Sequence, residues 1–202
     1  MTYKLHISKG NSKLGNLPNL NMPPCPVTAC GDMPCKDKCY AIKAYNQYPV
    51  VKEAWNDNWD FYNNDPKNFI EVFIKVMRRK KNKSLFRWHS SGELIDQNHL
   101  NDLIYIAKEL PNTHFLIFTK QYFLDYSEKP NNFEVIYSAW PGLDIPKHIL
   151  NKRIAFMVDK EGIETRHVNS NTYVCPGITK KVHCDSCKLC WKSNKNVIFP
   201  EH

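Results

Sequence analysis

The sequence predicts an α/β protein whose parallel strands and helices form a partial or closed (β/α) barrel of the TIM type. Three observations support this prediction. Apolar runs of strand length recur along the chain, segments of helical periodicity or helix length separate them, and the cysteines occur only near the two ends. We therefore expect one β/α core with a cysteine-rich loop at each end of the chain.

The N-terminal part should contain a strand, a loop and a group of helices. Residues 3–7 alternate apolar and polar side chains, which predicts a short strand. A long loop follows and carries the first cysteines. Helical periodicity begins near Tyr40, is interrupted at Pro49 and restarts at Asp65, a favourable N-cap that precedes a proline.

The remainder of the chain alternates strands with helices or shorter connections. A helix is expected at residues 98–110, and a short connecting segment near residues 146–150. Apolar runs predict strands at residues 85–89, 115–119, 133–138, 154–158 and 197–199. This order is typical of a parallel sheet, because each strand needs a crossover to reach the next.

No internal repeat or low-complexity linker divides the 202 residues. We therefore expect a single domain over residues 1–202. It contains an N-terminal cysteine loop (8–39), a β/α core (40–158) and a C-terminal cysteine-rich segment (159–202).

The charge and hydropathy of the chain restrict the classes of partner and the cellular compartment that we expect for it. The net charge of +8 makes nucleic acid a possible partner, but the positive residues are spread along the chain. The one dense run, residues 78–83, lies where a helix should end, and cations there complement the helix dipole. No apolar run reaches the length of a signal peptide or a membrane span. We expect a cytoplasmic protein without a membrane partner.

The second cysteine group has the more specific spacing. In the cytoplasm, clustered cysteines more often bind metals than form disulfides, although disulfides or inert buried thiols remain alternatives. Cys184, Cys187 and Cys190 form a C-x2-C-x2-C run, which matches the first three ligands of a ferredoxin-type 4Fe-4S cluster, and Cys175 could supply a fourth. Zinc is the alternative metal.

The first cysteine group has a looser spacing. Cys30, Cys35 and Cys39 form a C-x4-C-x3-C run, and Cys25 is a weaker candidate. Three thiolates would leave one iron of a 4Fe-4S cluster open to a substrate. The two groups could hold two clusters or share one.

Polar residues follow the expected strands, where functional sites of parallel α/β proteins lie. Strand alternation places Arg87 and His89 on one face, opposite Phe86 and Trp88. His89 is expected to transfer protons, because the ordinary pKa of histidine is near neutrality. The candidate catalytic residues are Arg87, His89, Glu93 and Lys120, and the candidate cofactor-binding residues are Ser90, Ser91 and Gly92.

Two of the candidates have a simpler interpretation as well. Arg87 and His89 could pair with each other inside the core and have only a structural role. If they are functional, Arg87 or Lys120 would hold a carboxylate of the substrate.

Several short segments resemble the bacteriophage family known as gene product eighty-eight, and the resemblance extends over nearly the whole chain. It implies the cytoplasm of a host bacterium as the location. The segments that carry it are residues 11–15, 34–41, 86–93, 118–120, 138–142, 175–177 and 190–191.

More distantly, the chain resembles the radical S-adenosylmethionine enzymes. These have a partial (β/α) barrel, a three-cysteine loop after the first strand and a Gly-Glu motif after the second, as Gly92 and Glu93 would be here. The resemblance implies S-adenosylmethionine as a possible cofactor. The chain departs from that pattern, because each gap in its cysteine loop is one residue longer and Ser91 stands where those enzymes have glycine.

Three functional hypotheses follow. The first is a 4Fe-4S enzyme whose open iron acts on a small molecule, by radical chemistry on S-adenosylmethionine or as a lyase or desulfidase of a sulfur compound. The second is an electron-transfer or cluster-carrier protein with a redox partner. The third is a zinc-stabilised basic module that binds nucleic acid.

Overall fold

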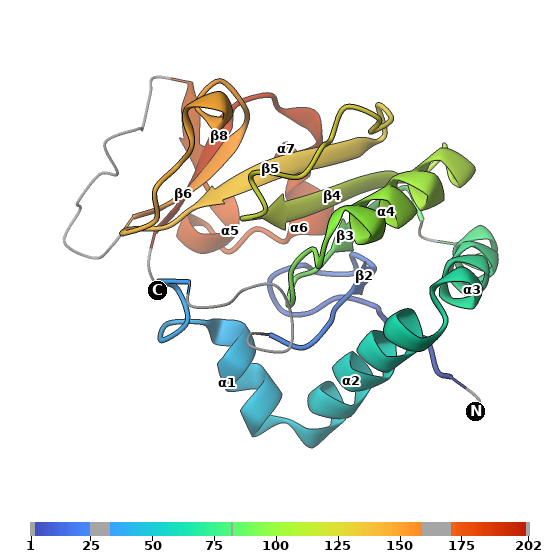
Figure 1. Cartoon of the computed structure of the whole chain (residues 1–202). Helices are drawn as coiled ribbons and strands as arrows, with labels where there is room; N and C mark the ends of the chain where they lie inside the picture. Colours follow the sequence, from blue (N-terminus) through green and yellow to red (C-terminus); the bar gives the residue numbers. More distant parts are fainter. Residues whose placement is uncertain (1–2, 25–32, 82, 159–170, 201–202) are drawn as a thin grey trace.

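A mostly parallel eight-stranded sheet forms the centre of the computed structural model, which describes residues 3–24, 33–81, 83–158 and 171–200 (Figure 1). The strand order is β1-β2-β3-β4-β5-β6-β8-β7, and every neighbouring pair is parallel except β1 with β2. The strands are β1 (Ile7–Ser8), β2 (Asn19–Leu20), β3 (Leu85–Trp88), β4 (His114–Thr119), β5 (Phe133–Ala139), β6 (Ile154–Val158), β7 (Thr172–Val174) and β8 (Asn196–Pro200).

The longer helices lie in the first half of the chain and begin at residues suited to that position. Asp65 accepts a hydrogen bond from the backbone N–H of Asn68, and Asp96 accepts one from His99. The helices are α1 (Tyr40–Gln47), α2 (Pro49–Asn64), α3 (Pro66–Arg79), α4 (Gln97–Glu109), the 3-10 helix η1 (Lys147–Ile149), α5 (Pro176–Thr179), α6 (Cys184–Cys187) and α7 (Leu189–Lys192).

The two faces of the sheet pack against different parts of the chain. Along β4, Phe115 and Ile117 point into the main core, where side chains of α2, α3 and α4 also lie. The intervening residues Leu116 and Phe118 belong to a smaller cluster with residues of the C-terminal segment, such as Cys175. The short helices α5 to α7 therefore cover one face of the sheet and α4 the other, as Figure 1 shows.

The α/β class and the parallel strands are confirmed, but a closed barrel is not. In the described part of the chain, β1 and β7 form the two edges of an open sheet. The strand expected at residues 3–7 is reduced to its end, because only Ile7 and Ser8 pair with β2. Neither β2 nor β7 was expected, and both are too short to show a clear alternation.

No helix among the described residues is both long enough and apolar enough to cross a membrane.

Candidate functional site at the carboxyl edge of the sheet

The predicted polar residues of the two central strands lie at one edge of the sheet. Strands β2, β3 and β4 are parallel neighbours, so their carboxyl ends are adjacent. The segment His89–Glu93 follows β3, and Lys120 follows β4. The chain leaves β2 toward Met22, which contacts the β3 segment through its backbone: its N–H donates to the carbonyl of Ser91 at 3.1 Å.

His89 is the most unusual residue of this edge. Its φ of 49° lies in the left-handed region, which is uncommon for a residue with a side chain. Only 3 % of its surface is exposed, and neither ring nitrogen has a hydrogen-bond partner within the described structure. Burial, together with the nearby His99, lowers the pKa of His89 well below its ordinary value. The ring is therefore neutral at pH 7, with one nitrogen that can donate a hydrogen bond and one that can accept a hydrogen bond.

The expectation that Arg87 and His89 share a face is wrong. The ring of His89 lies 5.2 Å from that of His99 on α4, whereas the guanidinium of Arg87 lies 4.8 Å from the ring of Phe118 on the other face. The left-handed backbone at His89, just beyond the last residue of β3, interrupts the two-residue alternation of the strand. The two side chains therefore do not pair with each other inside the core.

Arg87 is a cation without an acidic partner in the described parts of the chain. Its Nε is buried and has no hydrogen-bond partner there. Its charge lowers the pKa of the Cys184 thiol, although burial raises that pKa more strongly. Three residues further along the chain, the buried hydroxyl of Ser90 is also unpartnered, while the Ser90 carbonyl accepts a hydrogen bond from Tyr40.

Both carboxylate oxygens of Glu93 accept hydrogen bonds from the protein. One oxygen accepts hydrogen bonds from the Thr119 hydroxyl at 2.7 Å and the Leu94 N–H at 2.8 Å, and the other accepts one from the Lys120 N–H at 2.8 Å. Burial raises its pKa, and the nearby Lys120 charge and these hydrogen bonds oppose that rise. Glu93 thus joins the end of β3 to the end of β4 and positions Lys120.

Ser91 and Gly92 are fixed against the segment that follows β2. The Ser91 hydroxyl donates to the Met22 carbonyl at 3.0 Å, and its N–H donates to Asn21 at 3.1 Å. Gly92 has a φ of 92°, and a Cβ there would approach Met22 to 3.0 Å. Of the three predicted cofactor-binding residues, Ser90 is thus the one whose hydroxyl is available.

His99 is also part of this edge, although its sequence pattern does not single it out. It lies on the buried side of α4 with 1 % of its surface exposed, and its Nδ1 accepts a hydrogen bond from the Ile95 N–H at 3.3 Å. Burial lowers its pKa to about 3. A histidine at an inward position of an amphipathic helix resembles any other core residue in sequence, so the available signal is only its place beside apolar neighbours.

The expected iron-sulfur function is wrong on the evidence of the described residues. They contain no group of three or more His, Cys, Asp or Glu side chains that could hold a metal ion. Cys25 and Cys30 lie outside the described residues.

Of the described C-terminal cysteines, Cys175 is buried, and Cys184, Cys187 and Cys190 are partly buried. Cys175 is buried against the sheet, and Cys190 packs beside it, 3.4 Å from the Tyr173 hydroxyl. Burial raises the pKa of Cys184 to about 11 and also raises that of Cys190, so both stay protonated at pH 7.

Comparison with known protein families gives a match over most of the chain. The model of a family described as Gene product 88 matches residues 4–193. No curated protein and no solved structure matches the chain. The expected resemblance to radical S-adenosylmethionine enzymes therefore has no support, and neither have the lyase and radical chemistries that it implied.

Proposed function

This chain belongs to the Gene product 88 family, and we propose that it binds a small carboxylate-bearing molecule at the carboxyl edge of its sheet. One observation carries the proposal. Four consecutive residues at the end of β3, Arg87 to Ser90, hold buried polar atoms without hydrogen-bond partners in the described structure, and Arg87 is the charged residue among them. Such atoms are costly to bury, about 1–3 kcal/mol each, and a bound ligand would remove that cost.

The charges at this edge favour an anion. Arg87 has no ion-pair partner among the described carboxylates, and the Lys120 backbone is held by Glu93, so its ammonium lies near the same edge. A guanidinium binds a carboxylate through two parallel hydrogen bonds, which gives a fixed orientation. In this proposal Arg87 binds the carboxylate and Lys120 adds a second positive charge.

His89 borders the site from the other face of the sheet. Its ring lies against His99, whereas the guanidinium of Arg87 lies against Phe118 on the opposite face, so we assign His89 no direct contact with the carboxylate. Burial lowers the pKa of His89 and keeps its ring neutral at pH 7. The left-handed backbone at this residue stores strain of about 1–3 kcal/mol, which is a common property of functional positions.

Ligand titration followed by NMR of the arginine side chains tests the proposal. The probes are acetate, glycine and succinate, with acetamide as a neutral probe of similar shape. We expect the Nε–H signal of Arg87 to shift with the carboxylates and not with acetamide. Arg87→Gln should weaken carboxylate binding by about tenfold or more, as expected for loss of a charge-assisted pair.

Arg79→Gln is the matched control, because Arg79 is exposed at the end of α3, away from this edge. Equal effects of the two arginine variants would contradict the proposal, and so would equal binding of acetamide and acetate.

A further inference from the structure

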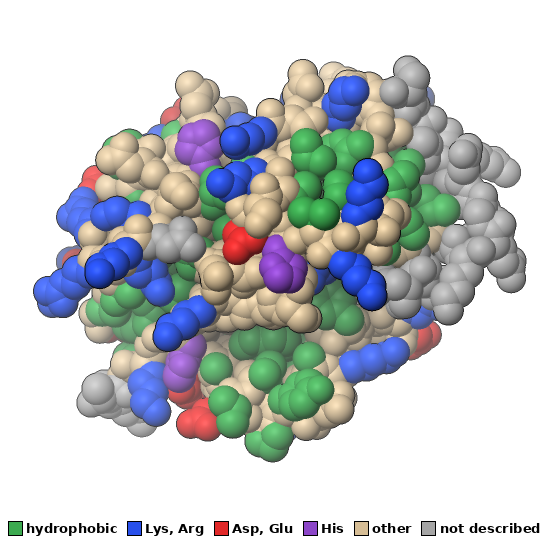
Figure 2. Space-filling view, turned by 180° about the vertical axis from the view of Figure 1, so that it is seen from behind, with side chains coloured by type: hydrophobic (Ala, Val, Ile, Leu, Met, Phe, Trp, Pro, Cys, Tyr) green, Lys and Arg blue, Asp and Glu red, His purple; other side chains and the backbone are tan. Residues whose placement is uncertain are grey.

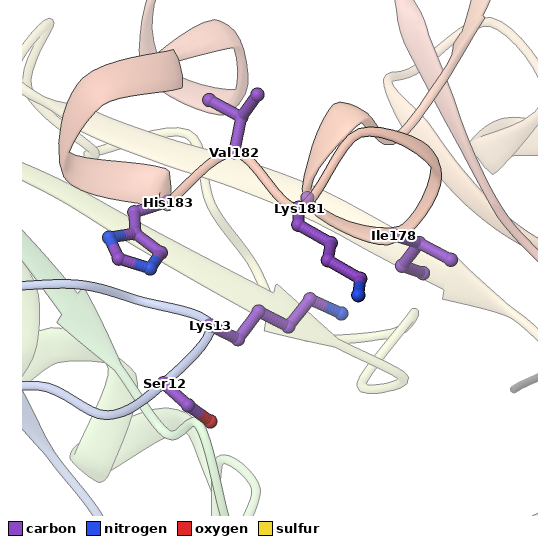
Figure 3. Close-up of a pocket in the computed structure, with 7 residues that line it drawn as sticks. Ser12, Lys13, Ile178, Lys181, Val182 and His183 are labelled. Atoms are coloured by element: carbon purple, nitrogen blue, oxygen red, sulfur yellow. The ribbon is translucent and has the colours of Figure 1, made fainter.

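We infer a second binding site, for a phosphate group, in a hollow between the N-terminal loop and the C-terminal segment. The hollow has a volume of about 470 Å³ and is lined by residues 12–13, 177–178 and 181–183. Figure 3 shows that the side chains of Lys13 and Lys181 extend toward the same space from opposite walls. This volume is within the range of small-molecule sites, roughly 300–1,000 Å³.

The lining of the hollow is basic. Its titratable residues are Lys13, Lys181 and His183, and no carboxylate is among the described residues that line it. Ser12 adds a hydroxyl donor. The nearest acidic neighbour in sequence, Asp185, does not line the hollow; its carboxylate accepts hydrogen bonds from the Asn16 N–H at 2.8 Å and the Ser186 hydroxyl at 3.1 Å, and it also interacts electrostatically with His183.

Lys13 is a partly buried ammonium without an anionic partner among the described residues. Burial is the main reason that its pKa is lowered, and the nearby Arg87 charge lowers it further. The groups that oppose this shift are the thiols of Cys175, Cys184 and Cys190, and burial keeps Cys184 and Cys190 protonated at pH 7. A further described contact of the ammonium is with the Phe199 ring, 5.1 Å away. An anion in the hollow would therefore neutralise a charge that the described residues leave uncompensated.

The two walls are held in place without a ligand. The Cys184 N–H donates to the Lys13 carbonyl at 3.1 Å, and the Asp185 N–H donates to the Leu14 carbonyl at 3.2 Å. Asn11 fixes the N-terminal wall, since its side chain accepts hydrogen bonds from the N–H groups of Lys13 at 2.9 Å and Leu14 at 2.8 Å. A preorganised site binds more tightly, because little conformational entropy is lost on binding.

The backbone conformation of Lys181 is a separate observation that favours a binding site in the hollow. Its φ of 53° lies in the left-handed region, although lysine has no side-chain group that stabilises this conformation locally. The strained residue is one of the cations that line the hollow, and strain of this kind collects at ligand sites.

Phosphate fits this lining better than a carboxylate does. Two lysines, a histidine and a hydroxyl line the hollow, and the two lysine side chains extend toward the same space, which suits a dianion. Lysine is a common phosphate ligand. Figure 2 shows further Lys and Arg side chains scattered over the face of the molecule opposite to that seen in Figure 1. The phosphate could belong to a small molecule or to a nucleic acid backbone.

Calorimetric titration of the full chain at low salt tests this inference, with inorganic pyrophosphate and a ten-nucleotide single strand as the two probes. Lys181→Gly removes one cation and relieves the left-handed strain, so this exposed position should tolerate the change. We expect about tenfold weaker pyrophosphate binding, the loss typical of one charge-assisted hydrogen bond. Lys180→Gly, at an exposed neighbour that does not line the hollow, should change the affinity by less than about twofold.

The probes distinguish the sources of the phosphate. If the pyrophosphate affinity depends on Lys181 and the strand does not compete, the ligand is a small phosphate compound. If the strand binds and loses the same factor in Lys181→Gly, the phosphate comes from nucleic acid. Both results support the site. Equal losses in the two lysine variants, or binding of neither probe, would overturn it.

A second measurement does not depend on any variant. Amine acylation should modify Lys13, and pyrophosphate should protect it while leaving the exposed Lys180 unprotected, as read by mass spectrometry. Protection of both lysines or of neither contradicts the inference.

Discussion

The two buried histidines at the carboxyl edge differ in their hydrogen bonding, and this difference indicates which of them has a structural role. His99 accepts a hydrogen bond from the Ile95 N–H, whereas neither nitrogen of His89 has a partner in the described structure. His99 therefore stabilises the fold, because it pairs a backbone N–H group. His89 makes no such hydrogen bond, and its own backbone is strained.

Replacing each of these histidines by asparagine should show this difference. His89→Asn should lower the free energy of unfolding by less than about 1 kcal/mol, because asparagine tolerates the left-handed conformation and no hydrogen bond is lost. His99→Asn should cost about 2–3 kcal/mol, because it leaves the Ile95 N–H unpaired and removes buried ring contacts. Urea denaturation measures both values, and the reverse order would show that His89 is the structural residue.

The same burial predicts how stability depends on pH. In the folded chain the pKa of His99 is about 3, below the unfolded value of about 6.5. The unfolded chain therefore binds more protons below pH 6.5, and stability falls as the pH decreases, by about 1.4 kcal/mol per pH unit for this histidine. His89 acts in the same direction, and Glu93, whose pKa is raised, acts in the opposite one.

His99→Gln isolates this contribution. The slope of unfolding free energy against pH between about pH 5.5 and 4.5 should decrease by about 1.4 kcal/mol per unit relative to the parent chain. Denaturant titrations at several pH values measure the slope. An unchanged slope would mean that His99 becomes protonated in the folded chain at these pH values.

At the scale of elements, the N-terminal loop and α6 meet at a glycine. Gly15 has a φ of 68°, and a Cβ there would lie 2.5 Å from the Asp185 carboxylate. That carboxylate accepts a hydrogen bond from the Asn16 N–H, so it cannot move without losing this bond. The close approach of two segments far apart in sequence therefore requires the absence of a side chain at this position.

Gly15→Ala should cost about 2–3 kcal/mol of unfolding free energy, from backbone strain and the loss of the charged hydrogen bond. Gly142→Ala is the matched control. Its φ of 81° gives similar strain, but its Cβ would approach only Pro34, at 3.9 Å. We expect a cost of about 1 kcal/mol there, measured by chemical denaturation. Equal costs would show that strain alone accounts for the effect at Gly15.

At the scale of the whole molecule, one buried arginine joins the C-terminal segment to the sheet. The guanidinium of Arg153 donates to the Glu134 carboxylate at 2.9 Å and to the carbonyls of Lys195 at 2.8 Å, Cys190 at 2.8 Å and Leu189 at 3.3 Å. Its side chain is only 7 % exposed. Arg153 thus supports the covering of the second sheet face together with apolar packing and with other hydrogen bonds, such as the one from Trp191 Nε1 to the His114 carbonyl at 3.1 Å.

Arg153→Met should destabilise the chain by about 3–5 kcal/mol, because it leaves a carboxylate and several carbonyls without their donor. Hydrogen exchange in residues 171–200 should increase more than in α4. Arg78→Met, which breaks an exposed ion pair with Glu109, should cost at most about 1 kcal/mol. A uniform increase in exchange over both regions would contradict a local role for Arg153.

The sequence by itself determined the α/β class, the positions of β3 to β6 and β8, and the edge at which polar residues gather. These features follow from local patterns. Apolar runs specify strands, Asp65 and Asp96 specify helix starts, and parallel strands must end at a common edge. Local pattern alone therefore assigns Arg87, His89 and Lys120 to one region.

Only the tertiary structure decided how the side chains of that region are used. The spacing of Cys184, Cys187 and Cys190 suggested a cluster, but whether a thiol becomes a ligand depends on burial and on neighbours that the chain brings from elsewhere. The left-handed backbone at His89 reversed the face predicted for it. The hollow beside Lys13 forms because Gly15 admits Asp185 across a long sequence separation. Such contacts are set by the packing of distant segments, which no local pattern encodes.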